Sequence, residues 1–215
     1  MRPNLDPILA FDCSAAHCAA AVVSDDQVLA QSRADMPRGS DHLLIPLLER
    51  VLAAAALGWR ELGALAVCTG PGNFTGIRIG IAAARGLALA LSVPAIGVGR
   101  LEALAEGTRR PVLASAAARR DSLHLQLFGA KRWDRPRHLD AAEIADLALP
   151  AGTVLLGPVA ARLPGYARGS EDDAADPRSL AAIARRRGPG ARPAPIYPRP
   201  PNADLPTEPP PLLLP

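Results

Sequence analysis

The chain has 215 residues, of which 49% are hydrophobic and 21% charged, and its net charge is +3. This length allows one large or two small domains with real cores, and the composition is typical of a globular protein rather than a disordered or fibrous one. Only 3% of the residues are aromatic, which argues against a nucleic-acid binder that stacks bases. The chain has three cysteines, Cys13, Cys18 and Cys68; so few argue against a disulfide scaffold and suit a reducing cytosol. The single lysine, Lys131, follows no glycine run, which excludes a P-loop nucleotide site.

The first segments of the chain have the pattern of strands. Residues 8–13 and 17–24 are apolar runs typical of buried strands, and residues 27–36 form a third strand after a turn at Asp25-Asp26. Three strands joined by such short connections predict an antiparallel meander.

Helices and strands then alternate. A helix is expected over 40–57, with Ser40 as its N-cap, Gly58 as its C-cap, and Pro46 either kinking it or shifting its start. The other elements expected in this half are a strand at 64–69, a helix at 75–92 capped by Thr75, a strand at 95–99 and a helix at 100–107. The order β-β-β-α-β-α-β-α is that of a ribonuclease-H-like domain.

The second half has the pattern of a reduced copy of the same unit. Its expected elements are strands at 111–118, 121–128 and 153–157 and helices at 141–149 and 177–187. From Gly188 onward proline dominates, which predicts a tail packed along the domain before it frays, with PPPLLLP as an alternative polyproline ligand. The predicted divisions are a first lobe at 1–107, a smaller second lobe at 108–187 and a proline-rich tail at 188–215.

Two of the predicted helices are apolar nearly all round. A surface helix normally has one apolar stripe, but 40–57 and 75–92 each have apolar residues well beyond one stripe. Either the chain itself buries both sides of these helices, or one side faces a partner. We favour the partner, because the small second half has little surface with which to cover both helices.

The segment 70–76 (GPGNFTG) joins a predicted strand to a helix N-terminus. Its glycines suit close approach to an anion, but a rigid structural turn is the favoured interpretation. Asp12, at the end of the first strand, is a candidate catalytic acid, although capping of the following turn is favoured. No two histidines are four residues apart and there is no C-x-x-C, so no metal site is expected. No targeting segment or membrane-spanning run is recognised, so a cytoplasmic location is expected.

Three stretches of the first half resemble the TsaB family: ILAFDCSAAHCAAAVV, SDHLLIPLLERVL and GALAVCTGPGNFTGIRIGIAAARGLALALSVPAIGVGRLEALAE. The resemblance covers residues 7–106 well, while AARRDSLHLQLF and IYPRPPNA resemble later signatures of the family more thinly. One departure is Ala117, which stands where the family's Asp-Ala-Arg pattern opens with an acidic residue. Any role of that carboxylate is therefore not carried over to this chain.

The resemblance implies an α/β fold of the actin-like ASKHA (ribonuclease-H-like) type, with two lobes of which the second is reduced. It also implies a non-catalytic dimerisation subunit, without a cofactor, that binds TsaD and is required for forming the threonylcarbamoyl group on the adenosine next to the anticodon of tRNAs. The family pairs with TsaD through a helix bundle of the first lobe, which corresponds here to 40–57 and 75–92. The implied partners are TsaD, the small ATPase TsaE as third member, a second copy of the chain when it is alone, and tRNA only through the complex, with no membrane.

Helix spacing selects the residues that would meet TsaD. The candidate contacts are His42, Leu43, Leu47, Arg50, Arg78, Ile79, Ala82 and Arg85. A vestigial anion loop would consist of Gly70, Gly72, Asn73, Thr75 and Gly76. The alternative function is an actin-like ATPase or phosphotransferase that uses Asp12 and the 70–76 loop, against which stands the absence of a carboxylate at Cys68-Thr69. A metalloprotease-like activity is a third hypothesis, which the histidine spacing does not support.

Overall fold

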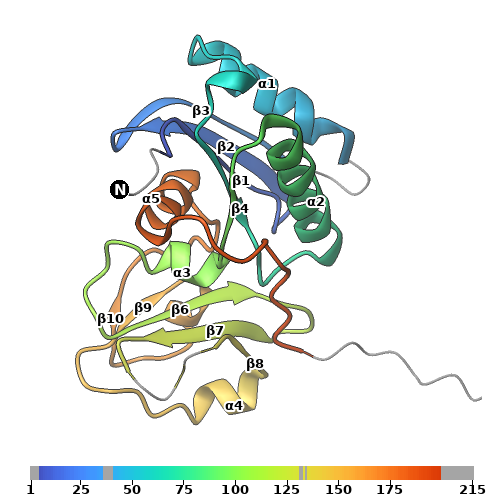
Figure 1. The fold of residues 1–215 in the computed structure, drawn as a ribbon. Coiled ribbons are helices and arrows are strands. Elements are labelled where there is room, and N and C mark those ends of the chain that lie inside the picture. The colour runs from blue at the N-terminus through green and yellow to red at the C-terminus, as the bar shows by residue number, and fades with distance from the viewer. Residues whose placement is uncertain (1–4, 36–40, 131–132, 134, 200–215) are drawn as a thin grey trace, which may run out of the picture.

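Two five-stranded sheets, one in each lobe, form the framework of the chain (Figure 1). The computed structural model describes residues 5–35, 41–130, 133 and 135–199. The strand orders are β3-β2-β1-β4-β5 in the first sheet and β10-β9-β6-β7-β8 in the second. Strands β6 to β10 take the same relative places in the second sheet as β1 to β5 take in the first. The two lobes are therefore copies of one unit, as the sequence predicted.

The first sheet combines an antiparallel meander with two parallel strands. Its strands are β1 (Ile8–Asp12), β2 (His17–Ser24), β3 (Gln27–Asp35), β4 (Ala64–Cys68) and β5 (Ala95–Val98). Strand β1 pairs antiparallel with β2 and parallel with β4, and the predicted meander is confirmed. Every residue of β1 and β4 is buried, because helices cover both faces of the sheet.

The two faces of the first sheet are covered by different helices. Helices α1 (Leu44–Ala54), preceded by the short helix η1 (Asp41–Leu43), and α2 (Phe74–Leu91) lie on one face, and α5 (Pro177–Arg187) lies on the other (Figure 1). The alternation of a strand explains this division. Leu9 and Phe11 of β1 pack against α1 and α2, whereas Ile8 and Ala10 pack against α5.

The start and end of α1 differ from the sequence prediction. Ser40 lies outside the described residues, and the helix begins at Leu44 with Pro46 in its first turn, so the proline shifts the start rather than kinking the helix. The helix ends at Ala54, because Ala56 takes a left-handed conformation (φ 54). Gly58 is therefore not the C-cap; it precedes the short helix η2 (Trp59–Glu61).

The N-cap of α2 also corrects a prediction. Asn73 occupies the cap, and its side-chain Oδ1 accepts hydrogen bonds from the backbone N–H groups of Thr75 (3.0 Å) and Gly76 (3.1 Å). Thr75, the predicted cap, is instead the second residue of the helix. Asparagine is a strong capping residue, and here it satisfies two of the helix's first N–H groups.

The second lobe repeats the unit with shorter elements. Its strands are β6 (Val112–Ala117), β7 (Leu123–Phe128), β8 (Arg137–Leu139), β9 (Val154–Leu156) and β10 (Ala167–Arg168). Helix α3 (Arg100–Leu104) closes the first repeat and packs between the lobes on β6. The second lobe carries α4 (Ala141–Ala145) and the short η3 (Pro158–Ala161). The sequence did not predict β8 and β10, which are only three and two residues long.

The C-terminal part of the chain returns to the first lobe. Helix α5 lies within the predicted second lobe, 108–187, yet its buried side chains pack on the first sheet. After it, the Ile196 N–H donates to the Thr69 carbonyl (2.9 Å), so this part of the proline-rich segment packs along the first lobe as predicted. The region of PPPLLLP lies outside the described residues, and the predicted lobe boundaries stay predictions.

Candidate partner-binding face and the neighbouring glycine loop

The outer side of α2 is apolar and exposed. Among the described residues, α2 is the single helix long and apolar enough to cross a membrane. The buried core helix of a soluble protein can be equally long and apolar, but only 22% of α2 is buried. Leu89 is 84% exposed and Phe74 is 52% exposed. The exposed positions recur every three or four residues, on one side of the helix: Phe74, Arg78, Ala82, Arg85 and Leu89. An apolar side of this extent is the kind of surface that marks a binding site.

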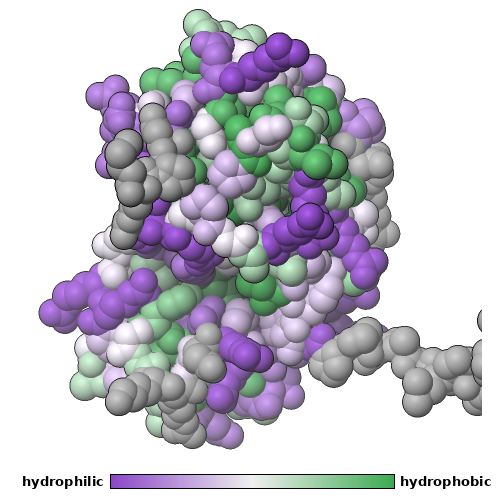
Figure 2. Space-filling view, in the orientation of Figure 1, coloured by the Kyte–Doolittle hydropathy of each residue, from purple (hydrophilic) through white to green (hydrophobic). Residues whose placement is uncertain are grey.

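Helix α1 extends this apolar side. Ile45 is exposed beside the exposed His42 and Arg50, while Leu44 and Leu48 of the same helix point into the core. Figure 2 shows hydrophobic side chains gathering over the lobe that carries α1 and α2, bordered by hydrophilic ones. We call the exposed sides of α1 and α2 together the α1–α2 face.

Most of the predicted contact residues lie on this face. His42, Arg50, Arg78, Ala82 and Arg85 are exposed, and Leu43 and Ile79 are half-buried. Leu47 is fully buried in the core under α1, so it offers no surface to a partner. The sequence analysis missed Ile45, Phe74 and Leu89, although the spacing of Leu89 from Ala82 and Arg85, seven and four residues, puts it on the same side.

A small aromatic cluster borders the face at the start of α2. The Arg78 guanidinium lies 3.7 Å from the centre of the Phe74 ring, and its Nε donates to the Tyr197 hydroxyl (3.1 Å). The Tyr197 and Phe74 ring centres are 5.3 Å apart. Further along α2, Arg85 donates to the Pro193 carbonyl. The chain after α5 therefore fixes both arginines of α2 through hydrogen bonds, and Phe74 of the same helix adds a cation–π contact to Arg78.

The 70–76 loop is packed tightly against the turn that follows β1. A Cβ at Gly72 would lie 2.1 Å from the Ser14 carbonyl oxygen, and one at Gly76 would lie 1.9 Å from that of Cys13. The Asn73 N–H donates to the same Ser14 oxygen (2.7 Å). Because neighbouring backbone fills the space and the Asn73 side chain occupies the helix N–H groups, the geometry favours a structural turn over an anion site.

Asp12 caps the turn after β1, as favoured from the sequence. It is fully buried, and its Oδ1 accepts from the Ser14 N–H (2.7 Å). Its Oδ2 and the His17 Nε2 are both buried, lie 3.8 Å apart and have no hydrogen-bond partner among the described residues. Burial lowers the pKa of His17, and the neighbouring Asp12 carboxylate opposes this.

The three cysteines lie in the same region and are buried. The Sγ atoms of Cys13 and Cys18 are 3.0 Å apart, and the Cys68 thiol donates to the Ser14 hydroxyl (3.4 Å). The hydrogen bond with Cys18, followed by burial, raises the pKa of Cys13, and burial raises the pKa of Cys68. Thiols held protonated and away from solvent are poor nucleophiles.

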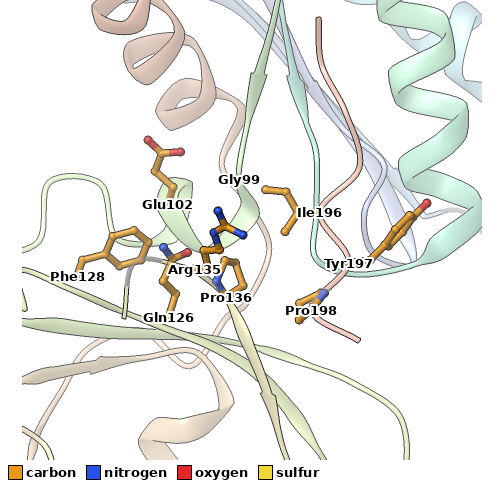
Figure 3. A pocket seen from close by; sticks show the side chains of 9 residues that line it. All are labelled: Gly99, Glu102, Gln126, Phe128, Arg135, Pro136, Ile196, Tyr197 and Pro198. Atoms are coloured by element: carbon orange, nitrogen blue, oxygen red, sulfur yellow. The ribbon is translucent and has the colours of Figure 1, made fainter. Parts of the chain in front are cut away.

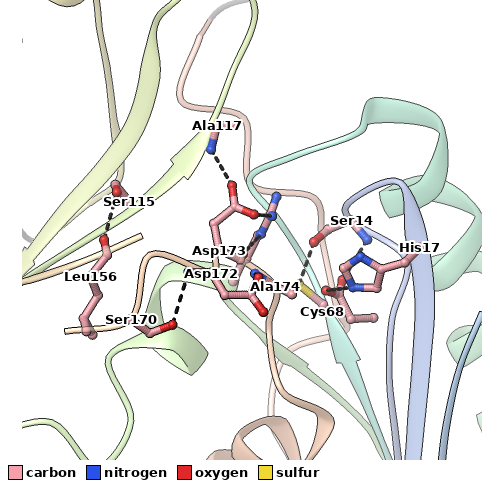
Figure 4. Close-up of polar contacts among 12 residues, drawn as sticks. Ser14, His17, Cys68, Ser115, Ala117, Leu156, Ser170, Asp172, Asp173 and Ala174 are labelled. Carbon is pink, nitrogen blue, oxygen red and sulfur yellow. Dashed lines mark hydrogen bonds and ion pairs between the residues drawn. The ribbon is translucent and has the colours of Figure 1, made fainter. Parts of the chain in front are cut away.

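A buried ion pair links the lobes at the base of this region. Arg100, only 3% exposed, donates from Nη2 to the Asp173 carboxylate (2.8 Å) and from Nε to the Asp173 carbonyl (2.7 Å). The other oxygen of that carboxylate accepts from the Ala117 N–H (2.7 Å; Figure 4). At the position where the sequence analysis expected an acidic residue, the backbone thus receives a carboxylate from elsewhere in the chain.

Two cavities lie near the junction of the lobes. The larger, of about 630 Å³, is lined by Phe128 and Gln126 of β7, by Arg135 and by residues 196–198 (Figure 3). The smaller, of about 390 Å³, includes His17 and Asp172 in its wall. Glu102, on the wall of the larger cavity, is already paired with Arg187 (2.6 Å). No residue of α1 or α2 lines either cavity.

Comparison with known proteins places this fold in a family. A family model described as "TsaD: tRNA N6-adenosine threonylcarbamoyltransferase" matches residues 35–145, just over half of the chain. The protein of Escherichia coli (strain K12) called tRNA threonylcarbamoyladenosine biosynthesis protein TsaB is 38% identical over 103 residues, 48% of this chain and 44% of that protein. The Bacillus subtilis (strain 168) protein of the same name is 31% identical over 102 residues, 47% of this chain and 44% of that protein. The matches thus span a little under half the length of these curated relatives.

Solved structures match over nearly the whole described chain. YeaZ from Pseudomonas aeruginosa is 26% identical, with a TM-score of 0.73 over 88% of this chain and 98% of that chain. A second structure from that organism, described as similar to peptidase YeaZ, is 27% identical, with a TM-score of 0.74 over 89% and 99%. Component A of the (R)-2-hydroxyglutaryl-CoA dehydratase of Acidaminococcus fermentans shares the fold at 9% identity, with a TM-score of 0.54 over 84% and 98%.

These matches confirm the expected actin-like ASKHA fold with two lobes. The family model matches the part of the chain that contains α1, the glycine loop and α2. The chain therefore belongs to the family of TsaD-like domains and, within it, to the TsaB proteins.

Proposed function

We propose that this chain is a non-catalytic subunit that binds TsaD through the α1–α2 face and is required for forming the threonylcarbamoyl group on the adenosine next to the anticodon of tRNAs. The names of its relatives support the pathway. The observation that carries the binding role is the exposed apolar side of α2, with Leu89 84% exposed. Burying such a side chain against a partner is worth about 1.5–3 kcal/mol.

The packing of the loop and of Asp12 supports a role without catalysis of its own. The backbone of Cys13 and Ser14 packs directly against the glycine loop, and one carboxylate oxygen of Asp12 accepts the Ser14 N–H. TsaE is then the third member of the assembly, and tRNA is reached only through the complex. In the absence of TsaD, the same apolar face is available to pair two copies of the chain.

The binding role is tested by mixing this chain with TsaD from the same organism and measuring the mass of the species formed, by size-exclusion chromatography with light scattering. We expect a heterodimer for the wild type and separate peaks for Ala82→Glu, because the variant places a charge in the apolar contact. Ala82 is exposed, so the variant should still fold, which circular dichroism checks. The matched control is Ala142→Glu, the same change at an exposed helical position of the second lobe, and it should keep the heterodimer. Separate wild-type peaks would refute the proposal.

One observation favours the second candidate, an actin-like ATPase or phosphotransferase. The Asp12 Oδ2 is buried beside the glycine loop without a hydrogen-bond partner among the described residues. Calorimetric titration of the chain alone with Mg-ATP separates the two functions. A binding subunit should give no heat of binding, whereas heat that Asp12→Asn abolishes would support the enzyme.

A further inference from the structure

Two histidines of the second lobe face each other across neighbouring strands. His124 of β7 and His138 of β8 are direct partners in the antiparallel register. Their Nδ1 atoms lie 3.4 Å apart, while the ring centres are 5.1 Å apart and the ring planes are inclined by 56°. The rings are therefore not stacked and approach each other through their Nδ1 edges.

The distance between the two nitrogens is informative. It lies within hydrogen-bond distance, with donor and acceptor set by the tautomer, but it is longer than the ~2.7–3.2 Å of N–H···O hydrogen bonds in proteins. Two imidazole nitrogens bound to one tetrahedral zinc, with Zn–N bonds of about 2.05 Å, lie about 3.3 Å apart. The observed 3.4 Å thus matches the spacing of two ligands on one tetrahedral metal.

The protonation of the pair also suits a metal ligand. Burial lowers the pKa of His124 to about 4, with help from His138 and Arg100, and burial is the main cause that lowers the pKa of His138. Neutral imidazole is the form that binds metals. Arg199 acts against a cation at both rings, whereas the carboxylates of Glu143 and Asp140 act in its favour at His138.

Those two carboxylates are fixed next to the histidine pair. They lie at the start of α4, which follows β8 directly (Figure 1). The Asp140 Oδ1 accepts from the Glu143 N–H (2.9 Å), and the Glu143 Oε2 accepts from the Asp140 N–H (2.8 Å). This reciprocal capping holds negative charge at the strand end that carries His138.

We propose that His124 and His138 bind one divalent metal of the zinc type through their Nδ1 atoms and so link β7 to β8. Among the described residues, no group of three or more His, Cys, Asp or Glu side chains could hold a metal. The pair therefore supplies two ligands, and two water molecules or other added ligands complete the tetrahedron. The site is separate from the α1–α2 face and does not depend on the proposed function. The sequence analysis expected no metal because it considered helical spacing and did not predict β8.

Calorimetric titration of the full chain with zinc chloride tests the site. We expect binding of one zinc per chain in the wild type. Since the loss of an outer-shell partner already weakens metal affinity about 10- to 100-fold, His138→Ala should weaken it at least tenfold. The matched control is His42→Ala, the same change at an exposed histidine of the first lobe, and it should bind like the wild type.

A second measurement keeps the test independent of folding. Zinc should raise the melting temperature of the wild type and of His42→Ala but not that of His138→Ala or His124→Asn, because a ligand stabilises only a fold that binds it. Circular dichroism without metal shows whether each variant is folded. No zinc binding by the wild type, or equal binding by folded His138→Ala, would overturn the proposal and leave a long contact between two neutral rings.

Discussion

Burial governs the ionisable side chains of the first lobe at the level of single residues. His17 is 4% exposed, and burial is the main reason why its pKa is lowered. Arg33 and Arg100 lower this pKa further, while Asp12 and Asp172 oppose the effect. The folded chain therefore keeps His17 neutral at pH values where a histidine of the unfolded chain takes up a proton.

We expect the free energy of unfolding to decrease as the pH falls below about 6.5, where free histidine protonates. Below that pH the unfolded chain binds a proton at His17 that the folded chain does not yet bind, so acid favours unfolding. Urea unfolding at pH 7.5 and 5.5 measures the effect in the wild type and in His17→Gln. The decrease should be smaller in the variant, whereas His42→Gln, at an exposed position, should behave like the wild type. An equal decrease in His17→Gln would contradict the prediction.

At the level of elements, the position of α2 depends on how closely its first turn approaches β1. Gly76 lies in that turn, and a Cβ there would sit 1.9 Å from the Cys13 carbonyl oxygen. Gly86 lies in the same helix, is exposed, and has no atom within 4 Å of an added Cβ. The same residue type therefore has opposite consequences at two positions of one helix.

Substitution of each glycine by alanine should show this difference. Gly76→Ala should destabilise the fold by about 1–3 kcal/mol or more, because backbone must move to admit the methyl group. Gly86→Ala should stabilise it by about 0.5–1 kcal/mol, because alanine favours the helix. The midpoints of urea unfolding compare the two variants with the wild type. If Gly76→Ala were as stable as Gly86→Ala, the inferred close contact between Gly76 and the Cys13 carbonyl would be wrong.

Periodicity sufficed to predict the longer elements of this chain. The strands β1 to β5 and the helix α5 follow from apolar runs and spacing in the sequence, and the structure confirms them. Strands β8 and β10 have three and two residues, too few for alternation to be recognised. Local competition also escaped prediction, because Asn73 and Thr75 are both good caps and only the three-dimensional turn selects Asn73.

The candidate face was predicted in outline and not in each residue. The surplus of apolar residues points to the two helices on which the structure shows exposed apolar side chains, but the side of α1 that packs on the sheet could not be chosen from that surplus. The sequence therefore predicts Leu47 as a contact although it lies in the core, and it does not predict the exposed Ile45. The pairing of His124 with His138 depends on the register between β7 and β8. Because β8 was not predicted from the sequence, this register could not be predicted either.

At the level of the whole molecule, one buried ion pair joins segments that lie far apart in the sequence. Arg100 comes from the start of α3, Asp173 from the chain before α5, and Ala117 from the end of β6. Such a contact has no local sequence signal, because its partners are distant along the chain. The α5 arginines add further pairs, including Arg186 with Glu106 (2.6 Å); the Arg186 side chain is 60% exposed, so this pair contributes little.

We expect Asp173→Ala to destabilise the molecule by about 3–5 kcal/mol, because it leaves the buried guanidinium of Arg100 without its carboxylate and the Ala117 N–H without its acceptor. The matched control is Asp121→Ala, which also removes the carboxylate partner of an arginine, Arg162. The Asp121 side chain is 75% exposed, so this loss should cost only about 0–1 kcal/mol. Urea unfolding of both variants measures the difference. Equal costs would mean that the lobes are held together by apolar packing of α3 and α5, and that the buried pair only fixes their register.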